Sequence, residues 1–188
     1  MNAPLTISLA PLSFEWHVDA LQQVYLATPA YWAMYNLLTA PAGQADNDLR
    51  AAAETPGRTM MGIVCRVEAH EGASAGVELI GLIDFRLHWP NEQVVSIGMV
   101  MVAEAYQRLG VATQAWRLLK PWLASQGQMQ KARLTVEQFN PGALQFFQSL
   151  GFTLTGEANR MKVGDKFVRL LAMELPLVHD GANKPIGT

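Results

Sequence analysis

The sequence predicts an α+β fold of mixed α/β layers, with helices packed against a central sheet. Runs rich in β-forming residues occur at the start, in the middle and at the end of the chain, and helical patterns separate them. Two pairs of these runs follow each other closely enough to form hairpins. Half of the 188 residues are hydrophobic, so we expect a single domain with a buried core, covering residues 1–177.

The first part of the chain predicts one strand and two helices. Residues 5–12 alternate between apolar and polar side chains, and residues 13–29 follow as a helix with Ser13 as its N-cap. Residues 30–44 mix aromatic residues with proline and glycine, which indicates an ordered but irregular segment. Residues 45–57 predict a second helix that stops before a proline.

The middle of the chain predicts a hairpin, a central strand and a third helix. Residues 58–70 and 77–89 flank a glycine-rich stretch and form the hairpin. Residues 93–102 are almost continuously apolar, which predicts a strand covered on both faces. The third helix contains Pro121, which should kink it or end it a turn early. Its predicted buried face consists of Val111, Ala115, Leu118, Leu119 and Trp122.

The last part predicts a strand, a helix and a closing β pair. Residues 131–139 form the fifth strand, residues 140–152 the fourth helix, and residues 152–161 and 166–177 the pair. The prediction is thus about seven strands and about four helices. Residues 178–188 have little to bury, so we expect a disordered C-terminal tail.

Composition argues against several classes of protein. The net charge of −2 provides no basic surface for a phosphate backbone, so nucleic acid is not an expected partner. The single cysteine, Cys65, has no disulfide partner and no neighbours at metal-ligand spacing, so no metal is expected. The sequence shows neither a signal peptide nor an apolar run of about 18 residues. We therefore expect a soluble, cytoplasmic protein with no membrane association.

The segment from the central strand into the third helix carries the clearest chemical signal. An apolar strand leads into a turn that contains Gly110, and a helix begins immediately afterwards. The first N–H groups of such a helix lack intrahelical partners, so they can bind an anion such as a diphosphate. An ordinary strand-to-helix connection would show the same pattern. Neither a dinucleotide-binding glycine motif nor a P-loop motif is present.

Two motifs resemble one family. Residues 107–112, "QRLGVA", resemble the Q/R-x-x-G-x-G/A acyl-CoA signature of the GCN5-related N-acetyltransferases. Residues 134–152, "LTVEQFNPGALQFFQSLGF", resemble the second signature of that family, with Asn140, Phe147 and Phe152 in register. The order of elements over residues 5–177 also agrees with the family.

The resemblance implies a mostly antiparallel sheet that is splayed between its fourth and fifth strands, with the cosubstrate acetyl-CoA between them. It implies that the pantetheine arm bonds to backbone groups of the fourth strand, that the diphosphate bonds to backbone N–H groups of the following turn, and that Asn140 steadies the arm. The implied cofactor-binding residues are Val100, Met101, Val102, Gln107, Arg108, Leu109, Gly110, Val111, Ala112, Thr113, Asn140 and Phe147.

The sequence departs from the family pattern at two catalytic positions. Ser96 stands where the family often has a glutamate, and Phe147 stands where it often has a tyrosine acid. Glu137 and Asp84 are the substitute carboxylates that we predict as the general base. Either one can equally be a polar residue on a solvated strand face.

These features predict an acetyl-CoA-dependent N-acetyltransferase that acts on a primary amine of a small molecule or peptide, by direct attack in a ternary complex. The predicted acceptor-binding residues are the aromatic side chains Tyr31, Trp32 and Tyr35, although aromatic residues in such segments often serve only in packing. A catalytically silent acyl-CoA-binding domain is the competing prediction. A homodimer is a further possible state.

Overall fold

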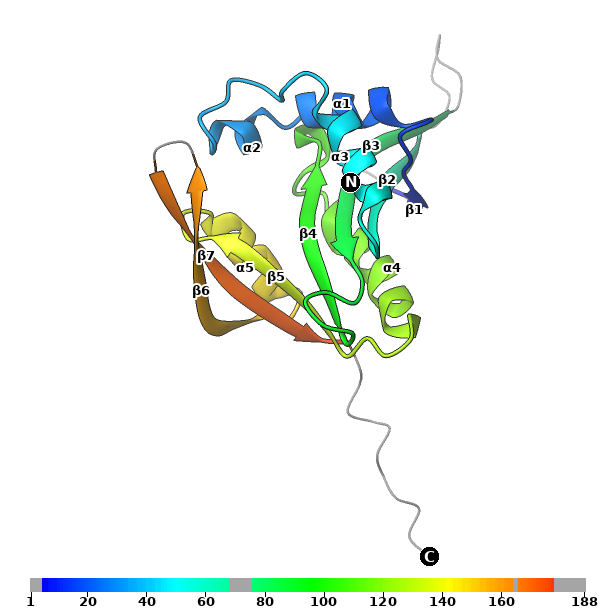
Figure 1. Ribbon diagram of the computed structural model, residues 1–188. Coiled ribbons are helices and arrows are strands. Elements are labelled where there is room, and N and C mark those ends of the chain that lie inside the picture. Colours follow the sequence, from blue (N-terminus) through cyan, green and yellow to red (C-terminus); the bar gives the residue numbers. More distant parts are fainter. Residues whose placement is uncertain (1–4, 68–75, 164–165, 178–188) are drawn as a thin grey trace, which may run out of the picture. The chain divides into compact units, whose positions relative to one another are not determined.

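The computed structural model describes residues 5–67, 76–163 and 166–177 (Figure 1). Its helices are α1 (Val18–Leu26), α2 (Pro29–Ala33), α3 (Gln44–Glu54), α4 (Val111–Ser125) and α5 (Pro141–Ser149), with a short 3-10 helix η1 (Glu104–Tyr106). Its strands are β1 (Ile7–Pro11), β2 (Arg58–Val67), β3 (Gly76–Arg86), β4 (Val94–Val102), β5 (Lys131–Glu137), β6 (Thr153–Val163) and β7 (Lys166–Pro176).

The seven strands form one sheet in the order β1-β2-β3-β4-β5-β7-β6. The pairs β1–β2, β2–β3, β5–β7 and β6–β7 are antiparallel. Both predicted hairpin pairings are therefore confirmed. The predicted mixed fold of about seven strands is confirmed as well, with α2 as a helix beyond the four expected.

The chain divides into two compact units. Unit 1 comprises residues 1–86 and 97–119, and unit 2 comprises residues 87–96 and 120–188. Two of the three boundaries fall inside β4 and inside α4, and the third follows the last residue of β3. The prediction of a single domain over residues 1–177 stays a prediction.

Unit 1 has its core where α1, α2 and α3 meet the strands β2, β3 and β4. Figure 1 shows α1 and α3 beside these strands, with α2 set further out on the side of β4. Apolar side chains recur at helical spacing in α1 and α3, so each helix has one apolar side. Packing that side against the sheet removes these side chains from water. The core cluster consists of Leu21, Val24, Tyr25, Trp32, Ala40, Ala45, Leu49, Ala52, Met60, Leu82 and Met101.

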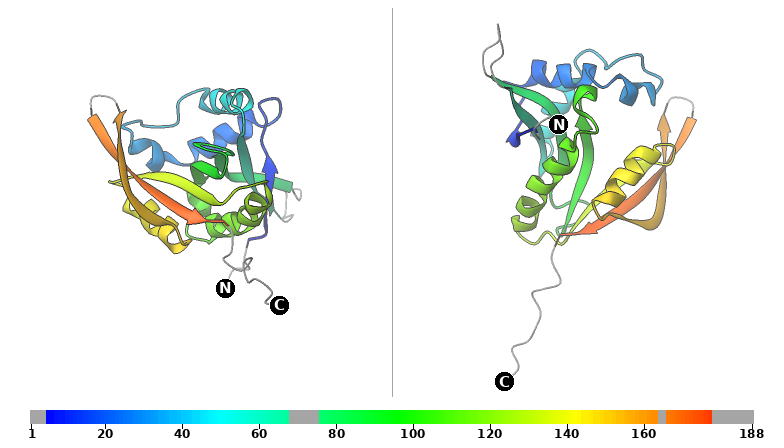
Figure 2. Two further views of the ribbon diagram at one scale, coloured as in Figure 1. Left: turned by 60° about the horizontal axis from the view of Figure 1, so that its bottom comes forward. Right: turned by 180° about the vertical axis from the view of Figure 1, so that it is seen from behind.

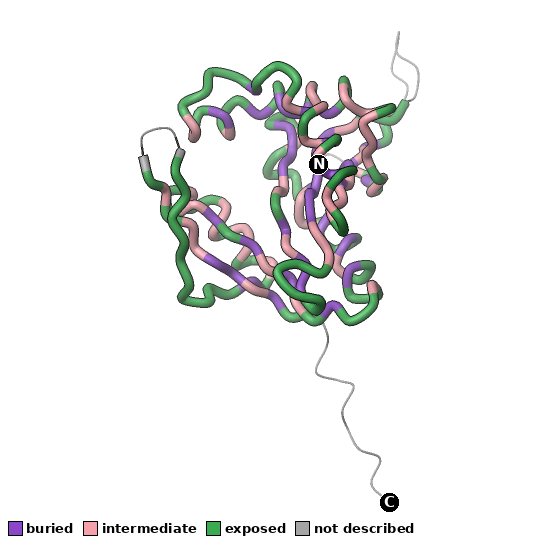
Figure 3. Tube along the Cα trace, in the orientation of Figure 1, coloured by how far each residue is buried: buried purple, intermediate pink, exposed green. Residues whose placement is uncertain are grey.

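Unit 2 is built on β5, β7 and β6, with α5 lying against them (Figure 2). Ala132, Leu134 and Val136 alternate along β5 and are buried, as are Met173 and Leu175 of β7. The other side chains of β5 are less buried, so this strand has one apolar and one polar face. β6 is exposed from Thr153 to Lys162, a stretch that Figure 3 colours green.

The first helix begins later than the sequence predicts. Ser13 does not cap it; instead the carbonyl oxygen of Ser13 accepts N–H groups from Trp16 and His17, and the Ser13 N–H donates to the His17 ring. Residues 13–17 therefore form a turn of their own, and His17 is the N-cap of α1. The irregular segment 30–44 likewise contains the short helix α2.

Helix α4 runs through Pro121 to Ser125, so it does not end a turn early, and the alternative prediction of a kink at Pro121 stays a prediction. Pro121 lies on the exposed side of the helix and removes only its own N–H donor, while the buried side continues to Leu123. The buried face is also different from the predicted one, because Trp116 and Leu123 join Val111, Ala115 and Leu119 on it. Leu118 and Trp122 instead lie on the flank, 46% and 42% exposed.

No helix in the described residues is both long enough and apolar enough to cross a membrane. The predicted tail, residues 178–188, lies outside the described residues, as do residues 68–70 of the predicted second strand.

Candidate functional site

The stretch of β4 from Gly98 to Val100 is more open than its sequence suggests. Gly98 is exposed and Met99 and Val100 are only half-buried, whereas a strand covered on both faces was expected. Met101 and Val102 are buried again. An apolar strand that is partly accessible within a sheet is a surface on which a ligand can lie.

Gly81 of β3 sets the position of the end of β4. A Cβ atom added at Gly81 would lie 2.4 Å from the carbonyl oxygen of Met101, a distance that backbone atoms do not tolerate. The absence of a side chain thus allows β3 to approach β4 closely at the residues predicted to bind pantetheine.

The turn after β4 is fixed by side-chain hydrogen bonds. The Gln107 amide Nε2 donates to the carbonyl oxygen of Val102 at 2.8 Å. The Tyr106 hydroxyl donates to Glu78 Oε2 at 2.7 Å, and this bond raises the pKa of Tyr106 to about 12. Tyr106 therefore stays neutral at physiological pH and holds η1 to β3.

The last residues of this turn have an unusual backbone conformation. Arg108 and Gly110 both have positive φ, 60° and 79°, and a Cβ atom added at Gly110 would meet no atom within 4 Å. The first helical bond of α4 runs from the Gln114 N–H to the Gly110 carbonyl oxygen. The N–H groups of residues 111–113, in the first turn of α4, thus have no intrahelical acceptor.

Ten of the predicted cofactor-binding residues, from β4 and this turn, therefore lie in one continuous segment of unit 1. The segment comprises Val100, Met101, Val102, Gln107, Arg108, Leu109, Gly110, Val111, Ala112 and Thr113.

Asp84, a predicted base, lies in the interior of unit 1. Both of its carboxylate oxygens accept hydrogen bonds from Arg58, the shortest at 2.7 Å from a terminal nitrogen of the guanidinium group. A Cβ atom added at Gly98 would lie 3.4 Å from Asp84 Oδ2, so the carboxylate sits over the exposed glycine of β4. Burial raises the pKa of Asp84, and the contact with Arg58 only partly offsets this.

Arg58 was not among the predicted site residues. It begins β2, and the Cα partner of Asp84 in the register is Met60, two residues further along β2. The predicted hairpin pairs residues 58–70 with 77–89. That pairing places Arg58 near Asp84 on the neighbouring strand, so the ion pair could have been inferred from it.

The predicted acceptor residues form an aromatic cluster on α2 and just after it. Trp32 is buried and donates its ring N–H to the Tyr25 carbonyl oxygen at 2.8 Å. Tyr31 packs edge-on against both Trp32 and Tyr35, and the two tyrosines are half-buried. Trp32 is thus a core residue, whereas Tyr31 and Tyr35 present part of their rings at the surface.

Glu137 and Asn140 lie at the end of β5 in unit 2. Glu137, the other predicted base, is half-buried and is on the polar face of β5. Asn140 caps α5: its Oδ1 accepts the Ala143 N–H at 3.1 Å. Its side-chain oxygen is therefore engaged in the helix cap, which leaves the NH₂ group as the part that can donate to a ligand.

Phe147 lies between two other aromatic rings. Its centroid is 5.0 Å from that of Phe146 and 5.5 Å from that of the buried Phe152. No residue of α5 is fully buried, and Phe146 and Phe147 are both half-buried. α5 therefore keeps part of its apolar surface accessible.

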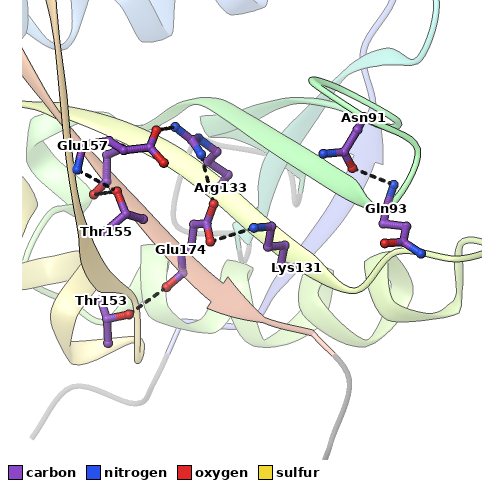
Figure 4. A network of polar contacts seen from close by, with 9 residues as sticks. Asn91, Gln93, Lys131, Arg133, Thr153, Thr155, Glu157 and Glu174 are labelled. Atoms are coloured by element: carbon purple, nitrogen blue, oxygen red, sulfur yellow. Dashed lines mark hydrogen bonds and ion pairs between the residues drawn. The ribbon is translucent and has the colours of Figure 1, made fainter.

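A charged network on unit 2 was not predicted (Figure 4). Arg133 of β5 contacts Glu174 of β7 and Glu157 of β6, and Lys131 bonds to Glu174 at 2.8 Å. The contact with Arg133 lowers the pKa of Glu157. Because each of these charges has a partner of opposite sign, the network joins three strands and offers no unpaired charge for catalysis. Within the described ranges, no group of three or more potential metal ligands occurs.

Comparison with known proteins identifies the class. Residues 31–152 match the model of the acetyltransferase (GNAT) family, which is more than half of the chain. The chain therefore belongs to the GNAT acetyltransferase family, and the predicted family membership is confirmed. No match was found among curated protein sequences.

Solved structures show the same fold. An acetyltransferase from Thermus thermophilus is 22% identical, with a TM-score of 0.68, and the match covers 93% of this chain and 99% of that one. A ribosomal L7/L12 alpha-N-protein acetyltransferase in complex with coenzyme A is 18% identical, with a TM-score of 0.67 and coverage of 91% and 94%. A spermidine/spermine N-acetyltransferase from Vibrio cholerae is 14% identical, with a TM-score of 0.62 and coverage of 92% and 95%. At these identities the likeness establishes the fold.

Proposed function

We propose that this protein transfers the acetyl group of acetyl-CoA to a primary amine of a small molecule or peptide. The observation that carries the proposal is the turn between β4 and α4. Arg108 and Gly110 have positive φ, an added Cβ at Gly110 would meet open space, and the first N–H groups of α4 follow directly and lack intrahelical acceptors. Such a group of donors suits the diphosphate of coenzyme A. The backbone from Val100 to Val102, which follows the partly exposed residues Gly98 and Met99, would hold the pantetheine arm.

In the proposed reaction the amine nitrogen attacks the thioester carbon. A C–N bond forms, the C–S bond breaks, and coenzyme A leaves as a thiolate while the nitrogen loses a proton to a base. A thiol with a pKa of about 8.5 leaves readily near neutral pH, so the lack of an acid hydroxyl at Phe147 lowers the rate without preventing the reaction.

Asp84 is the better placed of the two candidate bases. Its carboxylate lies over Gly98, in the accessible part of β4, and its raised pKa makes it a stronger proton acceptor than an ordinary aspartate. Arg58 holds the carboxylate in place but leaves lone pairs for a water molecule, through which the proton can pass. Glu137 remains the second candidate.

The proposed mechanism favours an acceptor amine of low pKa. At pH 7 a lysine-like amine of pKa about 10.4 is neutral in roughly one molecule in 2,500, whereas an α-amine of pKa about 8 is neutral in roughly one in ten. We propose that Tyr31 and Tyr35, supported by Trp32, line the acceptor pocket.

A catalytically silent acyl-CoA-binding domain is the second candidate function. It is favoured by Ser96 and Phe147, which replace both of the usual catalytic side chains. The silent domain would bind coenzyme A as the enzyme does but would release no thiol.

Thermal unfolding in the presence of ligand tests coenzyme binding. Acetyl-CoA at about 100 times its Kd should stabilise the fold by about 2.7 kcal/mol, which raises Tm by about 5–10 °C for a chain of this length. NAD should give no comparable shift. If coenzyme A gives no stabilisation, or if NAD stabilises equally, both candidate functions fail.

A pair of glycine substitutions locates the diphosphate. Gly110→Glu should abolish the stabilisation by coenzyme A through bulk and like-charge repulsion. Gly127→Glu is the matched control, since Gly127 also has positive φ and an added Cβ there would meet no atom within 4 Å, but it lies outside the turn. Unchanged affinity in Gly110→Glu would place the diphosphate elsewhere.

Thiol release with a panel of amines then separates the enzyme from the silent domain. Peptide N-termini, amino acids, polyamines and aminoglycosides are offered with acetyl-CoA, and free thiol is measured. Release above the hydrolysis background with one class supports the transferase. Silence across the whole panel, in a protein that binds coenzyme A, supports the binding module.

A further inference from the structure

One residue, Glu104, joins the turn after β4 to the junction between α1 and α2. Its backbone N–H donates to the Ala27 carbonyl oxygen at 2.9 Å. Its carboxylate Oε1 accepts the Ala30 N–H, also at 2.9 Å. Ala27 is the C-cap of α1 and Ala30 belongs to the first turn of α2, so Glu104 contacts both sides of the junction.

Helix α2 depends on this contact for its N-terminal cap. Thr28 occupies the N-cap position but makes no side-chain cap bond, because its buried hydroxyl donates back to the Tyr25 carbonyl oxygen at 2.9 Å. The Ala30 N–H, one of the donors that a helix leaves unsatisfied at its start, is accepted by Glu104 instead. The negative charge also suits this end of the helix.

The helix is too short to hold its own shape. It has five residues, and an isolated helix of that length is not stable in water. It is ordered by the Trp32 ring bond to Tyr25, by the approach of the Thr28 hydroxyl to Met101 Sδ at 3.2 Å, and by Glu104. Two of these three anchors, Met101 and Glu104, belong to β4 and the turn after it.

The same glutamate begins the turn that leads to Gly110. The Glu104 carbonyl oxygen accepts the Gln107 N–H at 3.2 Å, and the Ala103 carbonyl oxygen accepts the Tyr106 N–H at 2.8 Å. These bonds close η1, so a displacement of the turn moves Glu104 and with it the cap of α2. All of these residues lie within unit 1.

We infer that Glu104 is a positioning residue that couples the coenzyme-binding turn to α2. Coenzyme held at the turn fixes Glu104, and Glu104 in turn orders α2 and its tyrosine pair for the acceptor amine. By thermodynamic reciprocity, an ordered α2 also strengthens coenzyme binding. This inference rests on the proposed function, because it takes the turn as the coenzyme site and α2 as the acceptor side.

Hydrogen exchange of the full chain, followed by mass spectrometry with and without coenzyme A, tests the coupling. In the unaltered protein, coenzyme A should slow exchange in the segment 30–36 by roughly fivefold or more. Glu104→Ala should still bind coenzyme A by calorimetry but lose this protection. Glu104→Gln should retain it, because an amide oxygen also accepts the Ala30 N–H. Glu92→Ala, which removes an exposed glutamate in the turn before β4, should behave like the unaltered protein.

Each outcome identifies which idea fails. If calorimetry shows no binding of coenzyme A to the unaltered protein, the proposed function and the coupling both fall. If coenzyme A binds but does not change exchange in the segment 30–36, only the coupling falls. The coupling alone also falls if coenzyme A slows exchange in this segment by the same factor in Glu104→Ala as in the unaltered protein. If Glu104 had a purely structural role, Glu104→Ala would speed exchange in the segment 30–36 equally with and without coenzyme A. The ratio of the two exchange rates would then equal that of the unaltered protein.

Discussion

The side chain of Phe147 is one hydroxyl group short of the tyrosine that the family resemblance implies. Its ring is half-buried and packs edge-on against Phe146 and Phe152, so a hydroxyl at the ring edge would extend a group that is already ordered. A single substitution at Phe147 can therefore restore the hydroxyl group without any other change in α5.

Phe147→Tyr should raise turnover by restoring a proton donor for the departing thiolate. General acids contribute about 10²-fold at the low end, so the rise should be of that order or smaller. Steady-state kcat measures it, and Phe146→Tyr is the control, because it adds the same hydroxyl one position away. No rise in Phe147→Tyr would show that water or another residue already supplies the proton.

Asp84 allows a prediction about pH. A base must be deprotonated to act, and burial raises the pKa of Asp84, so kcat/KM should fall as the pH drops through a value above that of an ordinary aspartate. In Asp84→Asn this acidic limb should disappear together with most of the turnover. Glu137→Gln should keep it. If the acidic limb of the pH profile is instead lost only in Glu137→Gln, Glu137 is the base. Thermal melts of both variants verify that they fold.

At the level of elements, helix α5 depends on its cap more than the other long helices do. α4 buries Val111, Ala115 and Leu119, whereas α5 has no fully buried residue. Less burial means that local interactions contribute a larger share of the stability of α5.

Asn140→Ala should therefore destabilise the fold by about 1 kcal/mol, which lowers Tm by about 2–4 °C in a chain of this length. Asn140→Asp keeps a capping oxygen for the Ala143 N–H and should retain Tm. Because aspartate lacks the NH₂ donor, the same variant should raise the KM for acetyl-CoA if Asn140 also contacts the pantetheine arm. An unchanged KM would limit Asn140 to the helix cap.

The elements also show what the sequence could and could not predict. Periodicity and turn residues located every strand, and the two motifs located the turn at Gly110 and the helix after Asn140. The buried face of α4 was misplaced, because Leu118 and Trp122 fit the helical period as well as Trp116 and Leu123 do. The Arg58–Asp84 pair and the Glu104 contacts were missed for other reasons. The ion pair depends on the exact register of β2 and β3. The contact between Glu104 and Ala30 joins residues more than 70 positions apart in the sequence.

At the level of the whole molecule, the single cysteine reports on global opening. Cys65 is 2% exposed and lies in β2, paired with Ile7 of β1 and Glu78 of β3. Exposing its thiol requires separation of these strands, which are part of the core of unit 1.

The folded protein should accordingly show almost no reaction with a thiol reagent, and denaturant should release one reactive thiol per chain. Absorbance of an aromatic disulfide reagent measures both. Rapid reaction of the folded protein would mean that β1 separates easily from β2. Bound coenzyme A, if it stabilises the fold, should slow the residual reaction further.

The charged network of unit 2 has a consequence for self-association. β6 is the last strand in the order of the sheet, and a terminal strand can serve as a template for the backbone of another chain. Its register against β7 shifts between Leu154 and Ala158, and within that shift Glu157 is held by Arg133 from two strands away. An irregular backbone with an anchored charge is a poor template for strand addition, so this edge resists growth into an extended intermolecular sheet.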